Sequence, residues 1–82
     1  MNEIYKVVIE IFEELTGFNY NDVKDIPISD LKIESYIFIS FVVQIENRIN
    51  ITIPDELLVI DGLPDIDTFA KMIENIYKTN SL

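Results

Sequence analysis

The chain has 82 residues, of which 49% are hydrophobic and only two are glycine, so it predicts one small ordered domain and excludes a disordered or collagen-like chain. Fifteen acidic residues against six basic ones give a net charge of -9. This charge excludes nucleic acid and anionic membrane surfaces as binding partners and favours proteins with basic docking surfaces. Cysteine and histidine are absent, which excludes disulfides, the usual zinc ligands and serine–histidine catalysis, so we predict neither an enzyme nor a metal site.

The first predicted element is an amphipathic helix from Glu3 to Leu15. Gly17 predicts its end, because glycine adopts a left-handed backbone at little cost. Residues 18–34 mix asparagine, aspartate and proline with isolated apolar residues, so we expect a long loop that is pinned to the core. In the first predicted helix, from Glu3 to Leu15, the apolar residues recur at helical spacing: Ile4, Val8, Ile11 and Leu15.

The second predicted helix runs from Tyr36 to Asn50 and is the most apolar stretch of the chain. Isoleucine, valine and aromatic residues also favour strands, so a single buried strand is the local alternative. A strand would scatter the apolar stripe over both faces, whereas a helix gathers it on one. The stripe consists of Phe38, Phe41, Val42, Ile45 and Ile49.

After a short extended link, Pro54 or Asp55 is expected to start a brief helix that reaches Ile60. Asp65 or Asp67 can then cap a final helix, whose last four residues we expect to fray. The predicted fold is therefore all-α, a small four-helix bundle over a single domain of residues 1–82. It has three longer helices, a short third helix and a long loop between the first two. The final helix carries Phe69, Met72, Ile73 and Ile76 on one side.

A set of aspartates near the final helix suggests a calcium loop, but the glycine and closing glutamate of such a loop are missing. We therefore interpret Asp61, Asp65 and Asp67 as turn and cap residues.

Ser35 stands where the long loop meets the apolar helix. A hydroxyl there would be exposed, near the positive end of a helix dipole and beside the carboxylate of Glu34. The simplest interpretation of Ser35 is a helix N-cap, a role that serine often fills. A capping box is excluded, because Phe38 occupies the position that would need a glutamate or glutamine.

Two stretches of the chain resemble the acyl and peptidyl carrier protein family. In that family an aspartate–serine–leucine motif starts the second helix after a leucine-containing turn, and here Leu31-Lys32-Ile33-Glu34-Ser35-Tyr36 is similar. Residues 45–56, which contain Ile53-Pro54-Asp55, resemble the end of the family's second helix and the start of its third. The departures are Lys32 in place of a common glycine, Glu34 in place of aspartate and Tyr36 in place of leucine.

The resemblance implies that Ser35 carries 4'-phosphopantetheine, which a phosphopantetheinyl transferase moves from coenzyme A onto its hydroxyl. The thiol then comes from the prosthetic group, which explains how a chain without cysteine could hold thioesters. The implied function is a free-standing carrier of acyl, aminoacyl or peptidyl intermediates for nonribosomal peptide, polyketide, fatty-acid or related biosynthesis. Its implied partners are the transferase, an adenylating or acyl-loading enzyme and downstream biosynthetic enzymes.

One face of the second helix points away from the apolar stripe and is nearly uncharged. We expect it, together with Glu34, to bind partner enzymes through shape and apolar contact. The alternative is that these residues pack beneath the long loop. The face consists of Tyr36, Ile39, Ser40, Val43 and Asn47.

Two function classes remain open at this stage. The first is the carrier, which we expect to be cytoplasmic because neither a signal segment nor a membrane span is evident, and which we also expect to be a monomer. The alternative is a small helical protein–protein interaction module that receives no cofactor.

Overall fold

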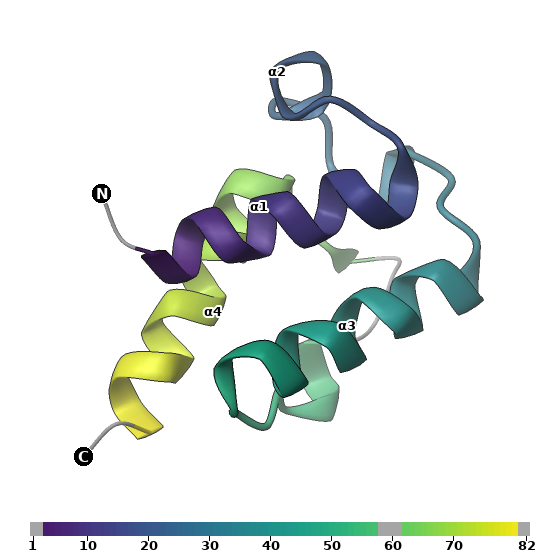
Figure 1. Ribbon diagram of the computed structural model, residues 1–82. Coiled ribbons are helices and arrows are strands. Elements are labelled where there is room, and N and C mark those ends of the chain that lie inside the picture. The colour runs from purple at the N-terminus through teal and green to yellow at the C-terminus, as the bar shows by residue number, and fades with distance from the viewer. Residues whose placement is uncertain (1–2, 58–61, 81–82) are drawn as a thin grey trace.

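The computed structural model describes residues 3–57 and 62–80, and it is an all-α fold with no strand among these residues (Figure 1). Three long helices enclose the core, and two short segments interrupt the link between the first two of them. The elements are α1 (Glu3–Thr16), α2 (Tyr20–Val23), the 3-10 turn η1 (Ile28–Asp30), α3 (Ser35–Ile49), the 3-10 turn η2 (Asp55–Leu57) and α4 (Ile66–Asn80).

The three long helices confirm the prediction, with boundaries that differ slightly from it. α1 ends one residue beyond Leu15, α3 begins one residue before Tyr36, and α4 extends to Asn80, within the four residues that were expected to fray. The predicted short third helix is represented by η2, a single 3-10 turn. Its expected continuation through Leu58 and Ile60, like the aspartate at position 61, lies outside the described residues.

α1 ends directly before Gly17, as predicted, because this glycine adopts a left-handed backbone. Gly17 has a φ of 79°, a left-handed backbone conformation, and its N–H donates to the Glu13 carbonyl over 2.9 Å. No atom outside its chain neighbours lies within 4 Å of the position that a Cβ would occupy. Backbone conformation alone, and not crowding, therefore requires glycine here.

Aromatic rings from all three long helices form the centre of the core. Phe41 of α3 lies with its ring centroid 5.7 Å from that of Phe12 of α1 and 5.7 Å from that of Phe69 of α4. Phe38 joins the cluster, with a centroid separation of 6.3 Å from Phe69. These residues are at most 3% exposed. The apolar stripe of α3 lies on one helical face that is buried except at Ile49, which is half-buried, so the alternative of a single strand is wrong.

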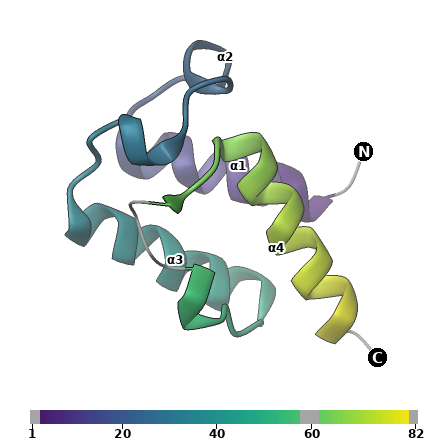
Figure 2. The same cartoon turned by 180° about the vertical axis from the view of Figure 1, so that it is seen from behind.

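The link between α1 and α3 is held against the start of α4, as Figure 2 shows from behind. Pro27 forms an isolated antiparallel bridge with Asp65, and the Ile28 N–H donates to the Pro64 carbonyl over 3.0 Å. Val23 and Ile28 are buried, whereas Ile26 is 39% exposed. The expectation of a pinned loop is confirmed, although α2 and η1 within it were not predicted.

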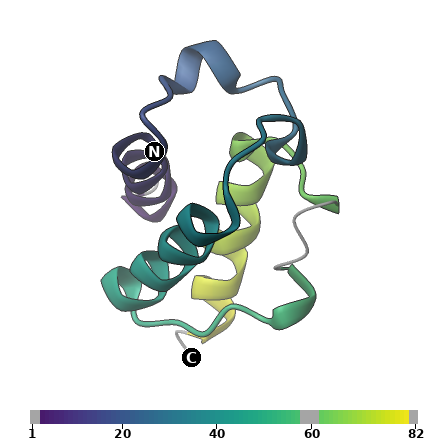
Figure 3. The same cartoon turned by 90° about the vertical axis from the view of Figure 1, so that its right-hand side faces the viewer.

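Hydrogen bonds between side chains attach α2 to α1 and α4. The Tyr20 hydroxyl lies 2.9 Å from the Tyr5 hydroxyl and donates to Asp67 Oδ1 over 2.8 Å. Tyr5 also donates to the same carboxylate oxygen, and Lys71 Nζ lies 3.2 Å from Asp67 Oδ2. The Asp67 carboxylate, on the first turn of α4, therefore joins three helices. In Figure 3, α2 lies above α1 and α4.

Asp65 is the residue that caps α4. Its Oδ1 accepts a hydrogen bond from the Thr68 N–H over 2.8 Å, and this bond lowers the pKa of the Asp65 carboxyl below its usual value. Of the two candidates from the sequence, Asp65 therefore fills the cap, while Asp67 receives the two tyrosines.

Within the described residues, none of the helices combines the length and the apolar character that crossing a membrane requires.

Candidate functional site

Ser35 lies on the surface at the first residue of α3. The residue that precedes the helix and occupies the cap position is Glu34, with φ of -66° and ψ of 146°, and its side chain forms no cap hydrogen bond. The interpretation of Ser35 as an N-cap is therefore wrong, because α3 begins one residue earlier than predicted and places Ser35 inside its first turn. Its hydroxyl is left exposed and makes no hydrogen bond to any residue that the structure describes.

A tight turn brings the chain from η1 to this serine. The Leu31 N–H donates to the Ile28 carbonyl over 3.0 Å and closes η1, and Lys32 then has a φ of 56°. A left-handed backbone is uncommon for a residue other than glycine, asparagine or aspartate. The turn reverses the chain, so that Ile33 returns to the core edge while Glu34 and Ser35 face solvent.

The face of α3 that was expected to bind partners is on the surface. Tyr36 is 64% exposed, Ile39 is 60% exposed and Val43 is 46% exposed. Asn47 is exposed and Ser40 is half-buried. The alternative in which this face packs beneath the long loop is wrong, since the loop lies against α4 instead.

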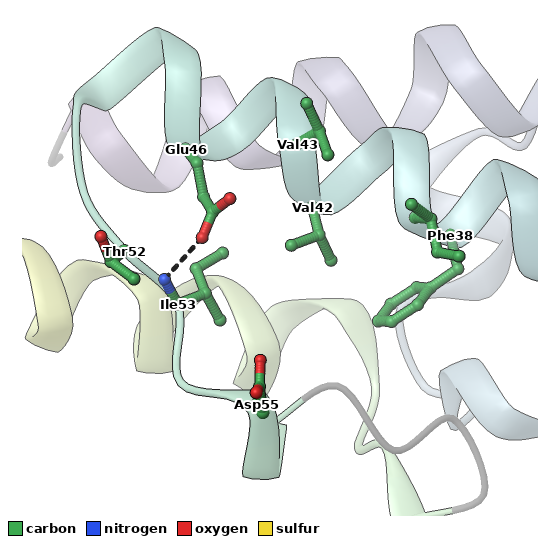
Figure 4. A pocket seen from close by; sticks show the side chains of 8 residues that line it. Phe38, Val42, Val43, Glu46, Thr52, Ile53 and Asp55 are labelled. Atoms are coloured by element: carbon green, nitrogen blue, oxygen red, sulfur yellow. Dashed lines mark hydrogen bonds between the residues drawn. The ribbon is translucent and has the colours of Figure 1, made fainter.

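A cavity of about 260 Å³ lies between α3 and the segment that follows it, and Figure 4 shows the residues that line it. Glu46 Oε2 accepts a hydrogen bond from the Ile53 N–H over 2.8 Å and holds the two walls together. The cavity is lined by Phe38, Ile39, Val42, Val43, Glu46, Thr52, Ile53 and Asp55.

Sequence reasoning assigned Ile39 and Val43 to partner docking but did not predict this cavity or its other wall. The signal that could have found it is the alternation of Ile51, Thr52 and Ile53, in which both isoleucines are buried and the threonine between them is exposed. Such a period of two predicts an extended segment packed against the helix before it.

A second cavity, of about 200 Å³, lies on the other flank of the α3 start and contains the three residues that precede Ser35. We call it the loop groove. It is lined by Leu15, Thr16, Phe18, Leu31, Lys32, Ile33, Glu34 and Ile37.

These features fit a covalent prosthetic group. The exposed hydroxyl of Ser35 is accessible to a modifying enzyme, and cavities on both flanks leave room for an arm that starts there. The Ile37 and Phe38 N–H groups donate to the Glu34 carbonyl, and no side chain caps the first turn of α3, so the N–H groups of Ser35 and Tyr36 have no partner among the described residues and are open to an anion.

Comparison with known protein families gives a match to the phosphopantetheine attachment site over residues 6–73. A search of curated proteins gives no match. Domains of the matched family carry 4'-phosphopantetheine covalently on a serine and are carriers without catalytic activity of their own. Since the match extends over more than half of the sequence, the chain belongs to the phosphopantetheine attachment site family and is a phosphopantetheine-carrying carrier protein.

Proposed function

We propose that Ser35 is the attachment residue and that the chain, as one free-standing domain of residues 1–82, holds acyl, aminoacyl or peptidyl intermediates as thioesters. The pathways that use such carriers are nonribosomal peptide, polyketide, fatty-acid and related biosynthesis. The observation that carries the proposal is the exposed hydroxyl of Ser35, which has no hydrogen-bond partner among residues 3–57 and 62–80, at the start of α3 in a chain that belongs to this family.

The other serines of the matched region support the same choice. Residues 6–73 contain three serines, namely Ser29, Ser35 and Ser40. Ser29 lies inside η1 and Ser40 lies in the second turn of α3, and both are half-buried. An enzyme that modifies a folded domain needs to surround the hydroxyl, which favours the exposed Ser35.

The chemistry expected of the chain at Ser35 is limited to one nucleophilic substitution at phosphorus. The Ser35 oxygen forms a bond to the phosphorus nearer the pantetheine in coenzyme A, its proton is lost, and adenosine 3',5'-bisphosphate leaves. The chain contains no histidine, so the transferase is expected to supply the base that accepts the proton. Once bound, the group supplies a thiol that forms thioesters.

Docking of partner enzymes is assigned to the exposed face of α3. Tyr36, Ile39 and Val43 expose large apolar side chains within two turns of Ser35, and Glu34 precedes it. Apolar side chains at the centre of an interface with polar groups at its rim are the usual composition of protein–protein contacts, and Ser40 and Asn47 provide that rim here. The loading enzyme and the transferase would both approach this face.

The proposal is tested by intact mass spectrometry after incubation with coenzyme A and a transferase of broad specificity. We expect the parent chain to gain the mass of one arm and the Ser35→Ala variant to gain nothing. Ser29→Ala is the matched control, since it removes a serine hydroxyl of the same region that lies outside the docking face, and it should be modified like the parent. A parent chain that stays unmodified would favour the interaction module without a cofactor, and a modified Ser35→Ala variant would place the arm on another residue.

A further inference from the structure

We propose that the arm on Ser35 does not extend freely into solvent but lies in the loop groove, with its phosphodiester paired with the ammonium of Lys32. The inference rests on the proposed attachment at Ser35. It adds that this chain provides a resting site for its own prosthetic group, formed by the end of α1 and the turn before α3.

The loop groove begins at the attachment residue itself. Lys32, Ile33 and Glu34 precede Ser35 directly, and Ile37 follows it by two positions. The opposite wall comes from the end of α1 and the residues after it, where Leu15 and Phe18 are half-buried and so keep part of their apolar surface open. An arm that leaves Ser35 therefore meets an apolar surface within its first few atoms.

The size of the groove fits part of the arm and excludes a cargo. Its volume of about 200 Å³ is below the ordinary range of about 300–1,000 Å³ for pockets that enclose a drug-sized ligand. The branched, dimethyl-bearing part of pantetheine is small and apolar enough for such a space. The thiol end would then emerge from the groove, where partner enzymes can reach it.

Lys32 supplies the charge that a phosphodiester needs. It is the only basic residue between Lys24 and Arg48 in the sequence. Its ammonium is in no ion pair with the part of the chain that the structure describes, and Lys32, three residues before Ser35, is one of the residues that line the groove. In a chain of net charge -9, a free cation at this point offsets the repulsion that Glu34 and the other carboxylates exert on a phosphate.

Charge also distinguishes this groove from the cavity on the other flank of α3. That cavity has two carboxylates in its lining, Glu46 and Asp55, and no basic residue. A phosphodiester would be repelled there, whereas the lining of the loop groove contains one basic residue, Lys32, and one acidic residue, Glu34, and so has no net charge. The phosphate end of the arm is therefore assigned to the loop groove.

Because the arm is covalently attached to Ser35, a weak contact with the loop groove is sufficient to keep the arm there for part of the time. A group held on a short flexible link has an effective concentration in the millimolar range, so a contact with a dissociation constant of about 1 mM is half occupied. An exposed ion pair and a few apolar contacts are enough for this affinity. The expected state is an arm that exchanges between the groove and solvent, and not one that is locked.

The test is nuclear magnetic resonance on the intact chain before and after loading, with mass spectrometry to establish that every variant is fully loaded. In the loaded parent we expect nuclear Overhauser effects between the geminal methyl groups of the arm and the Phe18 ring, together with a shift of the Gly17 amide. Gly17 is 18 positions from Ser35, so a change there requires contact across the groove. Changes confined to the neighbours of Ser35 would overturn the proposal.

Two lysine variants test the ion pair. Lys32→Gln should lower the ratio of bound to free arm about threefold, read from the Gly17 amide shift, while Lys32→Arg should retain it. Raising the salt to about 0.5 M should weaken the contact in the parent and have little effect in Lys32→Gln. Equal shifts in parent and Lys32→Gln would refute the role of the lysine. Failure to load would appear as an unchanged mass and would count against the attachment site instead.

Discussion

Two adjacent valines of α3 offer a sharp test of the docking face. Val42 is 6% exposed and lines the core, whereas Val43 is 46% exposed and points outward. Complete burial of a valine side chain contributes about 1.5–3 kcal/mol, so loss of the buried half of Val43 in the Val43→Asp change should cost at most about 1.6 kcal/mol of folding free energy. Val42→Asp places a carboxylate among apolar side chains and should cost at least about 4 kcal/mol.

The cost of Val42→Asp, but not that of Val43→Asp, is large relative to the free energy of unfolding of a domain of this size. The free energy of unfolding expected for a chain of 82 residues is about 4–12 kcal/mol, so Val42→Asp should be strongly destabilised or unfolded, and Val43→Asp should remain folded. Urea unfolding followed by circular dichroism measures both, and an unchanged dependence on urea concentration shows that the folded state has kept its compactness.

The functional half of this prediction concerns loading. Val43→Asp should lower kcat/KM for modification by the transferase about tenfold, because it places a charge at the centre of an apolar contact. Asn47→Asp is the control, since it adds the same charge at the edge of the face without removing apolar surface, and it should have a smaller effect. The reasoning is refuted if Val43→Asp unfolds the domain as Val42→Asp does, or if it folds and is loaded at the parent rate.

The remaining predictions concern stability. Gly17→Ala should destabilise the domain by about 1 kcal/mol in urea unfolding, because alanine resists the left-handed backbone while its methyl group meets no atom within 4 Å. Asp65→Ala should cost about 1 kcal/mol through loss of the bond from the Thr68 N–H. Since the folded pKa of Asp65 lies below 3.8, its contribution is present above that pH and is lost as the pH falls through the lowered value, so parent and variant stabilities should converge in acid. Tyr20→Phe should cost about 1 kcal/mol, because it removes one hydroxyl from Asp67, and no loss in thermal unfolding would contradict a role for that bond.

The sequence was sufficient for the long helices because their apolar residues repeat at helical spacing. α1 and α3 lie within one or two residues of the predicted boundaries, and Gly17 and Asp65 act as the expected stop and cap. The family resemblance around Ser35 also led to the family that the comparison identifies. Local signals of this kind do not depend on distant parts of the chain.

The link between α1 and α3 was less predictable because its structure depends on distant residues. Pro27 bridges to Asp65, and Tyr20 donates to Asp67, so the partners that order this link lie about 40 residues away along the chain. The left-handed turn at Lys32 was not predicted, because lysine has no preference for that conformation, and the glycine that is common at this position in the resembled family was not used as a signal for it. The loop groove beside Ser35 therefore became visible only in the structure.

The attachment of this link to the first turn of α4 has a consequence for cooperativity. Asp65 and Asp67 begin α4 and at the same time hold the chain that leads to Ser35. Fraying of that helix end and release of the link cannot proceed independently, so both belong to one local unfolding unit. The free energy of opening that unit sets how often the serine loses its defined position.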